Sequence, residues 1–306
     1  MGTRIEAAVT AHRRGHVFGR GALHLTDSAA RACLRRAHHQ PSELDLLIHA
    51  GLYKDRNTAE PALAAIIQED IGANPGSPPQ IGHHGTFSFD VQNGGCGVLT
   101  AAQLVDAFVG RGHAHLGMVV AGDADPSPRT SVGFPFAPAA GALLLGRAGN
   151  GVGFQAFSTR TFPEHAALFE ATLTWHPDAG LAHLGRNVVE VREAPELAGA
   201  CIEHAVEVAG ELLVSCGLHA SDVDLVIGSQ YPHGFADHVA RRLAIPDGRV
   251  PVVRSELERA HTAGPIAALE AAIDARQFAR ATHTLFVTAG AGITIAAALY
   301  AQRARA

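Results

Sequence analysis

The sequence predicts an α/β fold made of two duplicated halves, each with a buried, mixed β-sheet that helices cover on both faces. Short apolar runs of strand length alternate with longer amphipathic patterns that are typical of helices. Two pairs of similar segments also recur along the chain in the same order. The chain has 306 residues, which is enough for the large core that such a fold needs.

Strands are expected in both halves of the chain, with helices between them. The expected strands cover residues 4–9, 44–50, 87–92, 116–121, 141–146, 152–158, 223–228, 250–253, 284–289 and 294–300. The clearest helix patterns cover residues 27–38 and 197–216. Residues 159–187 contain two prolines and two glycines and predict an irregular crossover, with a loop over the site. We therefore place the first half at residues 1–175 and the second at 176–306.

The duplication rests on two pairs of segments. Residues 41–51 and 220–230 both follow an amphipathic helix, and each combines a serine with a buried strand pattern. Residues 115–122 and 283–290 form the second pair, and a helix rich in small residues precedes each of them. The same βα unit therefore occurs twice.

The duplication also predicts which functional groups meet. When the two small-residue helices are aligned on Leu104 and Leu269, Cys96 falls opposite His261. Two copies of one βα unit usually pack about a pseudo-two-fold axis, so equivalent helix N-termini face each other. The repeat therefore predicts that Cys96 and His261 converge.

Composition and charge argue against several classes of function. The formal net charge is −5 and the basic residues are scattered, so a nucleic-acid-binding surface is not expected. The apolar stretches fall well short of the ~18 residues that indicate a membrane-spanning helix. The first residues lack the apolar region of a signal peptide, and the four cysteines show no paired spacing. These features favour a reduced, cytoplasmic protein.

Neither a metal site nor a bound cofactor is expected from the sequence. The adjacent histidine pairs at 38–39 and 83–84 direct their side chains apart, and no third ligand is evident. The glycines at 19–21 and 290–292 lack the full glycine fingerprint of a dinucleotide-binding turn. Metal-dependent hydrolysis and nucleotide binding are therefore disfavoured.

The strongest indication of chemistry is Cys96, which stands at a sharp strand-to-helix turn. An alternating apolar strand pattern ends just before it, and an apolar helix pattern begins just after it. Unpaired N–H groups and the helix dipole at a helix N-terminus favour a thiolate. Glycines at positions 94, 95 and 97 let another molecule approach the sulfur closely. The context predicts covalent catalysis by this thiol.

Six segments, in order along the chain, resemble motifs of the thiolase superfamily, and specifically of β-ketoacyl-ACP synthase III-like enzymes. They are residues 89–97, 136–145, 224–230, 238–246, 260–270 and 289–294. The first of them resembles the turn around the family's nucleophile, and the last resembles its closing glycine-rich turn. The resemblance implies a five-layered αβαβα fold and a homodimer. It also implies that the substrate is an acyl thioester of coenzyme A or of an acyl carrier protein.

The resemblance assigns roles to three residues. A thiolate attacks a thioester carbonyl and takes the acyl group, which splits one transfer into two easier steps. Cys96 is the expected nucleophile, and the N–H groups of Cys96 and Ala291 are the expected oxyanion hole. His261 is the candidate for proton transfer or for hydrogen bonding to the second substrate, because an imidazole titrates near neutral pH.

The chain departs from the family pattern at two positions. Ser229 stands where the family has its first catalytic histidine, and His233, one helical turn later, is a candidate to replace it. A gapless count also places Gly95, not Cys96, at the nucleophile position. We favour a local shift in the turn that restores Cys96 to that position.

These residues predict an acyltransferase of fatty acid or polyketide-type specialised metabolism. It would load an acyl group onto Cys96 and pass it to a second substrate. Both C–C condensation and transfer to oxygen, nitrogen or sulfur stay open, because Ser229 weakens the case for condensation. An acidic carrier protein needs basic docking residues, for which Arg241 and Arg242 are candidates. Arg35 and Arg36 are further candidates.

Two alternatives stay open from the sequence. A non-catalytic partner subunit of an active ketosynthase would explain the missing histidine and the shifted turn. A thioesterase also fits, because a cysteine and a histidine can activate water as well as a second substrate.

Overall fold

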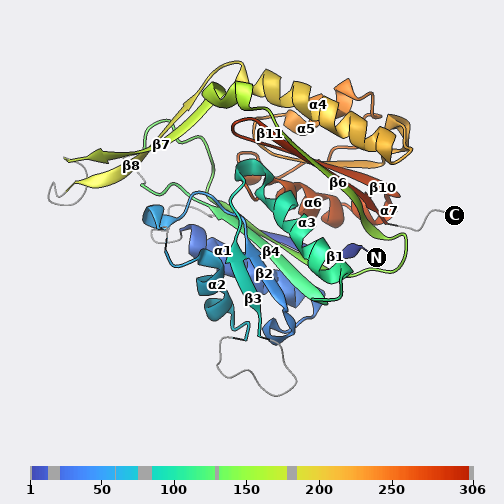
Figure 1. Cartoon of the computed structure of the whole chain (residues 1–306), viewed down its shortest axis with the longest axis horizontal. Helices are drawn as coiled ribbons and strands as arrows, with labels where there is room; N and C mark the ends of the chain where they lie inside the picture. Colours follow the sequence, from blue (N-terminus) through green and yellow to red (C-terminus); the bar gives the residue numbers. More distant parts are fainter. Residues whose placement is uncertain are drawn as a thin grey trace.

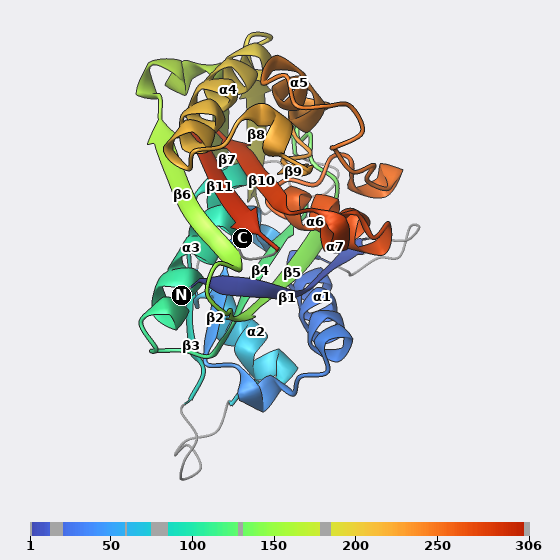
Figure 2. The ribbon, with the colours of Figure 1, turned by 90° about the vertical axis from the view of Figure 1, so that its right-hand side faces the viewer.

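A computed structural model of the chain describes residues 2–12, 21–58, 60–74, 85–127, 131–177 and 185–302. Two β-sheets lie face to face with two helices between them, and further helices cover the outer face of each sheet (Figures 1 and 2). The order of layers is therefore αβαβα, and the predicted fold class is confirmed. Within the described ranges, no helix is both long enough and apolar enough to cross a membrane.

The first sheet has five strands in the order β1-β5-β4-β2-β3. The strands are β1 (Thr3–His12), β2 (Leu46–His49), β3 (Phe87–Asp90), β4 (Leu116–Asp123) and β5 (Ala139–Arg147). The pairs β1–β5 and β5–β4 are antiparallel, whereas β4, β2 and β3 run parallel. Its helices are α1 (Ala22–Ala37) and α2 (Leu63–Ile71) on the outer face and α3 (Gly97–Gly110) on the inner face.

The second sheet has four strands in the order β6-β11-β10-β9. The strands are β6 (Gly153–Thr161), β9 (Leu225–Gly228), β10 (His283–Gly290) and β11 (Thr294–Ala301). Its helices are α4 (Leu197–Ser215) and α5 (Phe235–Arg242) on the outer face, with α6 (Gly264–Asp274) on the inner face and α7 (Gln277–Arg280) after it. Strands β4, β10 and β11 are buried along almost their whole length, as strands covered on both faces must be.

The two sheets repeat each other in strand order, and the repeat extends to single side chains. Asp45 accepts hydrogen bonds from the N–H groups of His115 (2.6 Å) and Leu116 (3.1 Å). Asp224 does the same for Thr282 (2.8 Å) and His283 (3.3 Å). Each carboxylate thus fixes the start of the long central strand of its own sheet, β4 or β10.

One predicted strand is absent. Residues 250–253 form no strand, although the Val226 N–H of β9 donates a hydrogen bond to the carbonyl oxygen of Arg249, just before them, at 2.8 Å. Pro251 has no N–H to donate, which disfavours a paired strand. The second sheet therefore has no counterpart of β3 in the part of the chain that the structure describes.

The segment predicted as an irregular crossover contains a β-hairpin. Strands β7 (Phe169–His176) and β8 (Arg186–Glu193) pair antiparallel and extend away from the layers (Figure 1). Most of β7 is exposed, so its sequence carries no alternating buried pattern. Strand β6 also pairs with β11, so the second sheet begins near residue 153, ahead of the boundary predicted at 175.

Two helices of the first half are capped by carboxylates from elsewhere in the chain. Asp55 accepts hydrogen bonds from the first two N–H groups of α1, at 2.8 and 3.1 Å. Asp90 does the same for α2, at 3.0 and 2.8 Å, and also accepts a hydrogen bond from Lys54 at 2.6 Å. Negative charge at a helix N-terminus is stabilising. Helix α1 begins earlier than its sequence predicts, because its cap is not local.

Asp90 joins α2 to the end of β3 through a charged, largely buried contact. Burial alone would raise the pKa of Asp90, but the nearby His49 and the hydrogen bonds from Lys54 and the Ala64 N–H outweigh it and hold the pKa well below its usual value. The Lys54 side chain is 6% exposed and the Asp90 side chain 14% exposed. Removing the carboxylate would leave a buried ammonium without its anion, which is costly.

We therefore expect Asp90→Asn to lower the free energy of unfolding at pH 7 by about 3 kcal/mol. Because the folded-state pKa lies below the unfolded one, this contribution is complete above an unfolded-state pKa of about 4. This contribution is lost as the pH falls further. The difference in the free energy of unfolding between wild type and variant should therefore become smaller in acid. Urea unfolding at a series of pH values measures both effects. Asp247→Asn, at an exposed turn, is the control, and equal midpoints for wild type and Asp90→Asn at pH 7 would contradict the assignment.

Candidate active site

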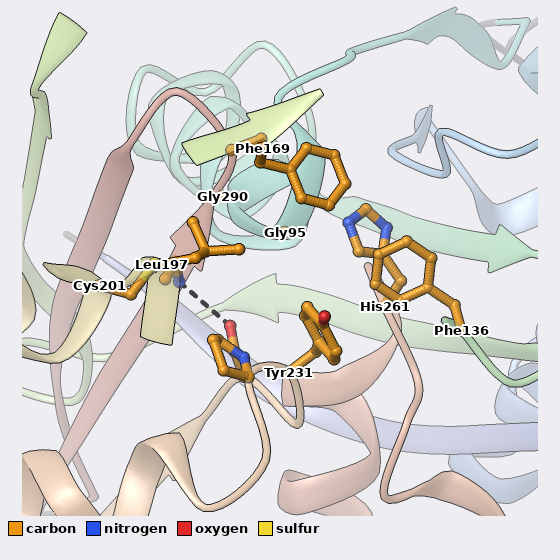
Figure 3. Close-up of a pocket in the computed structure, with 12 residues that line it drawn as sticks. Gly95, Phe136, Phe169, Leu197, Cys201, Tyr231, His261 and Gly290 are labelled. Carbon is orange, nitrogen blue, oxygen red and sulfur yellow. Dashed lines mark hydrogen bonds between the residues drawn. The ribbon is translucent and has the colours of Figure 1, made fainter. Parts of the chain in front are cut away.

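A pocket lies between the two sheets, where the ends of β3, β9 and β10 meet the N-terminal ends of α3 and α6 (Figure 3). Its volume is about 30 Å³. The lining residues are Gly95, Phe136, Phe169, Leu197, Cys201, Ser229, Tyr231, Pro232, His261, Ala289, Gly290 and Ala291. His261 and Phe136 form one side of the pocket, and Leu197 and Cys201 form the opposite side.

The turn between β3 and α3 approaches β10 closely. Gly94 has a φ of +47°, in the left-handed region that glycine adopts without strain. A Cβ atom on Gly95 would lie 2.1 Å from the carbonyl oxygen of Ala289, so only glycine fits this approach. The residue that the turn presents to the pocket is therefore Gly95. This is the residue that a gapless comparison with the family motif places at the nucleophile position.

The Cys96 thiol lies behind the pocket wall. Its side chain is fully buried, and its S–H donates to the carbonyl oxygen of Thr294 at 3.2 Å, with that of Thr288 at 3.5 Å. Burial raises the pKa of Cys96 to about 11, although hydrogen bonds from Thr288 and Ala296 act in the opposite direction.

The structure thus corrects the expectation that the sulfur of Cys96 opens into the pocket. One residue along a helix turns a side chain by about 100°, so a shift of one position moves the thiol from the pocket into the core. The segments that contain Cys96 and His261 do converge as predicted, because Gly95 and His261 line the same cavity. The role of Cys96 as nucleophile stays a prediction.

His261 is held from behind by a carboxylate. Its Nδ1 lies 3.5 Å from Oδ2 of Asp123 and 3.0 Å from Oγ1 of Thr262. The imidazole is 10% exposed. Because Nδ1 faces the protein, Nε2 is the nitrogen left for a substrate.

Asp123 is a fully buried carboxylate at the end of β4. Its Oδ1 accepts hydrogen bonds from the N–H groups of Leu52 and Tyr53, both at 2.8 Å, and its Oδ2 accepts one from Thr262 at 3.0 Å. Burial alone would raise the pKa of Asp123, but the hydrogen bond and charge of His261 and the neighbouring N–H groups hold it well below its usual value. The carboxylate stays ionised and can stabilise a proton on His261.

Aromatic rings surround the imidazole on its other sides. The ring centroid of Phe136 lies 4.2 Å from that of His261, and the ring centroid of Tyr53 lies 5.3 Å from it. Tyr231 packs edge-on against Phe136, with 5.0 Å between centroids. These apolar rings lower the polarity around the imidazole, which strengthens the attraction between Asp123 and a protonated His261.

The predicted oxyanion hole is only partly in place. The N–H of Ala291 lies in the turn between β10 and β11 and has no hydrogen-bond acceptor among the described residues. The N–H of Cys96, in contrast, already donates to the carbonyl oxygen of Asn93 at 3.0 Å. Ser229 also lines the pocket, and its Oγ accepts the N–H of Ala289 at 3.1 Å, which leaves its own proton for a substrate. Ala291 and Ser229 are therefore the available donors.

His233, Arg241 and Arg242 lie outside the pocket. Pro232 occupies the pocket wall, and His233 points outward into a separate hollow beside Pro251. His233 therefore does not replace the missing histidine in the pocket. Arg241 and Arg242 are exposed at the C-terminal end of α5.

Two residues of the site were not predicted from the sequence. Asp123 directly follows the buried apolar run of β4, and a lone carboxylate at the end of such a strand is the signal that could have indicated it. Cys201 falls in an apolar helix pattern like an ordinary core residue. It is 3% exposed, and burial raises its pKa to about 12.

The comparisons with known proteins agree with this architecture. Residues 213–301 match the C-terminal family model of 3-oxoacyl-[acyl-carrier-protein] synthase III. The chain is 27% identical over 302 residues to the β-ketoacyl-[acyl-carrier-protein] synthase III of Brucella anthropi, an alignment that covers 95% of this chain and 88% of that protein.

Solved structures show the same fold. The 3-oxoacyl-[acyl-carrier-protein] synthase III of Aquifex aeolicus has a TM-score of 0.75 at 20% identity, with 98% of this chain and all (100%) of the other covered. OleA of Xanthomonas campestris, solved with lauric acid and lauroyl-CoA, has a TM-score of 0.79 at 15% identity, with 98% and 99% covered. The chain is therefore similar to β-ketoacyl-ACP synthase III enzymes in sequence, and it shares the fold of the solved synthase III structures.

Proposed function

We propose that this chain is an acyl-transferring enzyme of the condensing type, which takes an acyl group from a thioester of coenzyme A or of an acyl carrier protein. The observation that carries the proposal is the pocket in which an imidazole backed by a buried carboxylate faces an unpaired N–H group. These are a base and an oxyanion donor, which acyl transfer requires. The relatives named as synthase III enzymes support the same class of reaction.

The geometry favours transfer without an acyl-enzyme intermediate. The acceptor attacks the thioester carbonyl while its proton passes to Nε2 of His261. Ala291 donates to the oxyanion that forms, and Asp123 stabilises the positive charge on the imidazole. Collapse of the intermediate expels the thiolate of the carrier, which takes the proton back from His261.

A covalent route through Cys96 would need more movement. The turn at Gly94 and Gly95 would have to open, and the thiol would have to give up its hydrogen bond to Thr294 and ionise against a pKa of about 11. The direct route needs none of these changes. We propose the direct route and test it against loading of Cys96.

Three further features belong to the proposal. Arg241 and Arg242 are exposed and would attract an acidic carrier protein. Phe87, on the edge strand β3, is 55% exposed and offers an apolar surface for a homodimer. A reduced, cytoplasmic location is consistent with the four free cysteines.

The proposed base gives the first test. His261→Ala should lower kcat by about 10²–10⁴-fold, because no other group takes the proton at that position. His238→Ala is a matched control on the exposed face of α5 and should keep the wild-type rate. Turnover is measured by mass spectrometry of products, with acyl-CoA and acyl-ACP donors and a panel of carbon, oxygen and nitrogen acceptors. An unchanged rate in His261→Ala would assign that imidazole to packing.

The direct route gives the second test. Cys96→Ala should keep turnover within about threefold of wild type, since the thiol lies outside the cavity, and intact-mass spectra of either protein should show no acyl adduct. Cys33→Ala, which removes a buried thiol that does not line the pocket, is the matched control and should also keep the wild-type rate. An adduct on the wild type that disappears in Cys96→Ala, together with lost turnover, would establish the covalent route instead.

A further inference from the structure

A cluster of side chains of the kinds that can ligate a metal ion lies outside the pocket, between η4 (Pro163–Leu168) and α4. The ligand atoms of Glu164, His165 and His204 all lie within 4.8 Å of one another. Nε2 of His165 and Nε2 of His204 are 2.9 Å apart. Neither pair of adjacent histidines considered in the sequence belongs to it, because its members are distant in the chain and meet only in the fold.

The spacing of the two nitrogens fits a shared metal ion. Zinc binds imidazole nitrogens at about 2.0–2.1 Å in tetrahedral geometry, which puts two such nitrogens roughly 3.3 Å apart. The observed 2.9 Å needs only a small separation of the rings. Glu164 is exposed, so a change of rotamer can bring its carboxylate to the third position, with water as the fourth ligand.

The ring of His204 is already oriented as a metal ligand. Its Nδ1 lies 3.3 Å from Oε2 of Glu207, and its ring stacks on the buried Phe162 with 3.6 Å between centroids. Glu207 in turn accepts a hydrogen bond from Arg160 at 2.6 Å. A carboxylate on Nδ1 fixes the tautomer in which Nε2 carries a lone pair, as in carboxylate–histidine–zinc arrangements.

The hydrogen bond between the two rings shows what changes when a metal binds. With its proton on Nδ1, His204 can only accept at Nε2, so His165 donates from its own Nε2. Zinc needs both lone pairs, so His165 must carry its proton on Nδ1 instead. No other group has to change protonation.

We propose that Glu164, His165 and His204 form a zinc site that pins η4 to α4. Two imidazoles and one carboxylate suit zinc better than magnesium or calcium, which prefer oxygen ligands. The ligand His204 is one helical turn from Cys201, and η4 leads into Phe169, so the ion would brace one wall of the pocket. The proposal does not depend on which reaction the pocket performs.

The test is zinc binding to the full-length, metal-free protein, measured by competition with a chromophoric chelator. The wild type should bind one zinc ion per chain. His165→Gln and His204→Gln should each weaken binding by at least tenfold, and Glu207→Gln by roughly 10–100-fold. His24→Gln, an exposed histidine on α1, should bind as the wild type does and controls for the other histidines.

Two further measurements distinguish a specific zinc site from non-specific binding of zinc to surface histidines. Cobalt(II) in place of zinc should give the intense visible absorption of a four-coordinate centre, and His204→Gln should abolish it. Zinc should raise the Tm of the wild type by roughly 2–5 °C, whereas magnesium should not. Wild-type affinity in both His165→Gln and His204→Gln, or no zinc bound by the wild type, would overturn the proposal.

Discussion

The site depends on one buried carboxylate. Asp123 ends the central strand of the first sheet, and it accepts hydrogen bonds from the loop after β2 and from the segment before α6. That segment belongs to the second half of the chain, so Asp123 joins the two halves at the pocket. The bond to Thr262 spans 139 positions in the sequence. Because so many donors converge on it, an ionised group that would be costly in the core becomes a fixed element of the structure.

A second constraint is the close approach of two backbones. Gly95 passes the Ala289 carbonyl at a distance that excludes any side chain, and this contact brings the turn before α3 against the end of β10. Ala291 lines the same cavity. Because only glycine fits at position 95, the turn presents no side chain to the pocket there, and the thiol of the next residue, Cys96, is buried in the core.

The larger features of the fold could be predicted from the sequence because they follow from periodicity. Buried strands leave apolar runs, and a duplicated gene leaves paired segments such as those that contain Asp45 and Asp224. Strand β7 of the hairpin could not be predicted, because its residues are mostly exposed and leave no apolar pattern.

The site was harder to predict, since its contacts are long-range and sensitive to register. Nothing in the sequence near Asp123 indicates His261 as its partner, because the contact forms only when the sheets pack. The direction of the Cys96 side chain depends on where the turn ends, and a difference of one residue moves the sulfur from the cavity to the core. The order of the segments is a robust signal, whereas the direction of a single side chain is not.

The electrostatics of the pocket favour an imidazole base over a thiolate. Asp123 and Cys96 are both buried titratable groups, but their surroundings differ. Asp123 is compensated by several N–H donors and by His261, so it keeps its charge. Cys96 has a carbonyl oxygen as the acceptor for its S–H, and burial leaves its pKa near 11, so it keeps its proton at neutral pH. A fixed negative charge beside His261 can stabilise a protonated imidazole, and the low polarity of the aromatic wall strengthens that effect. In the proposed reaction the site therefore stabilises a proton on nitrogen rather than negative charge on sulfur.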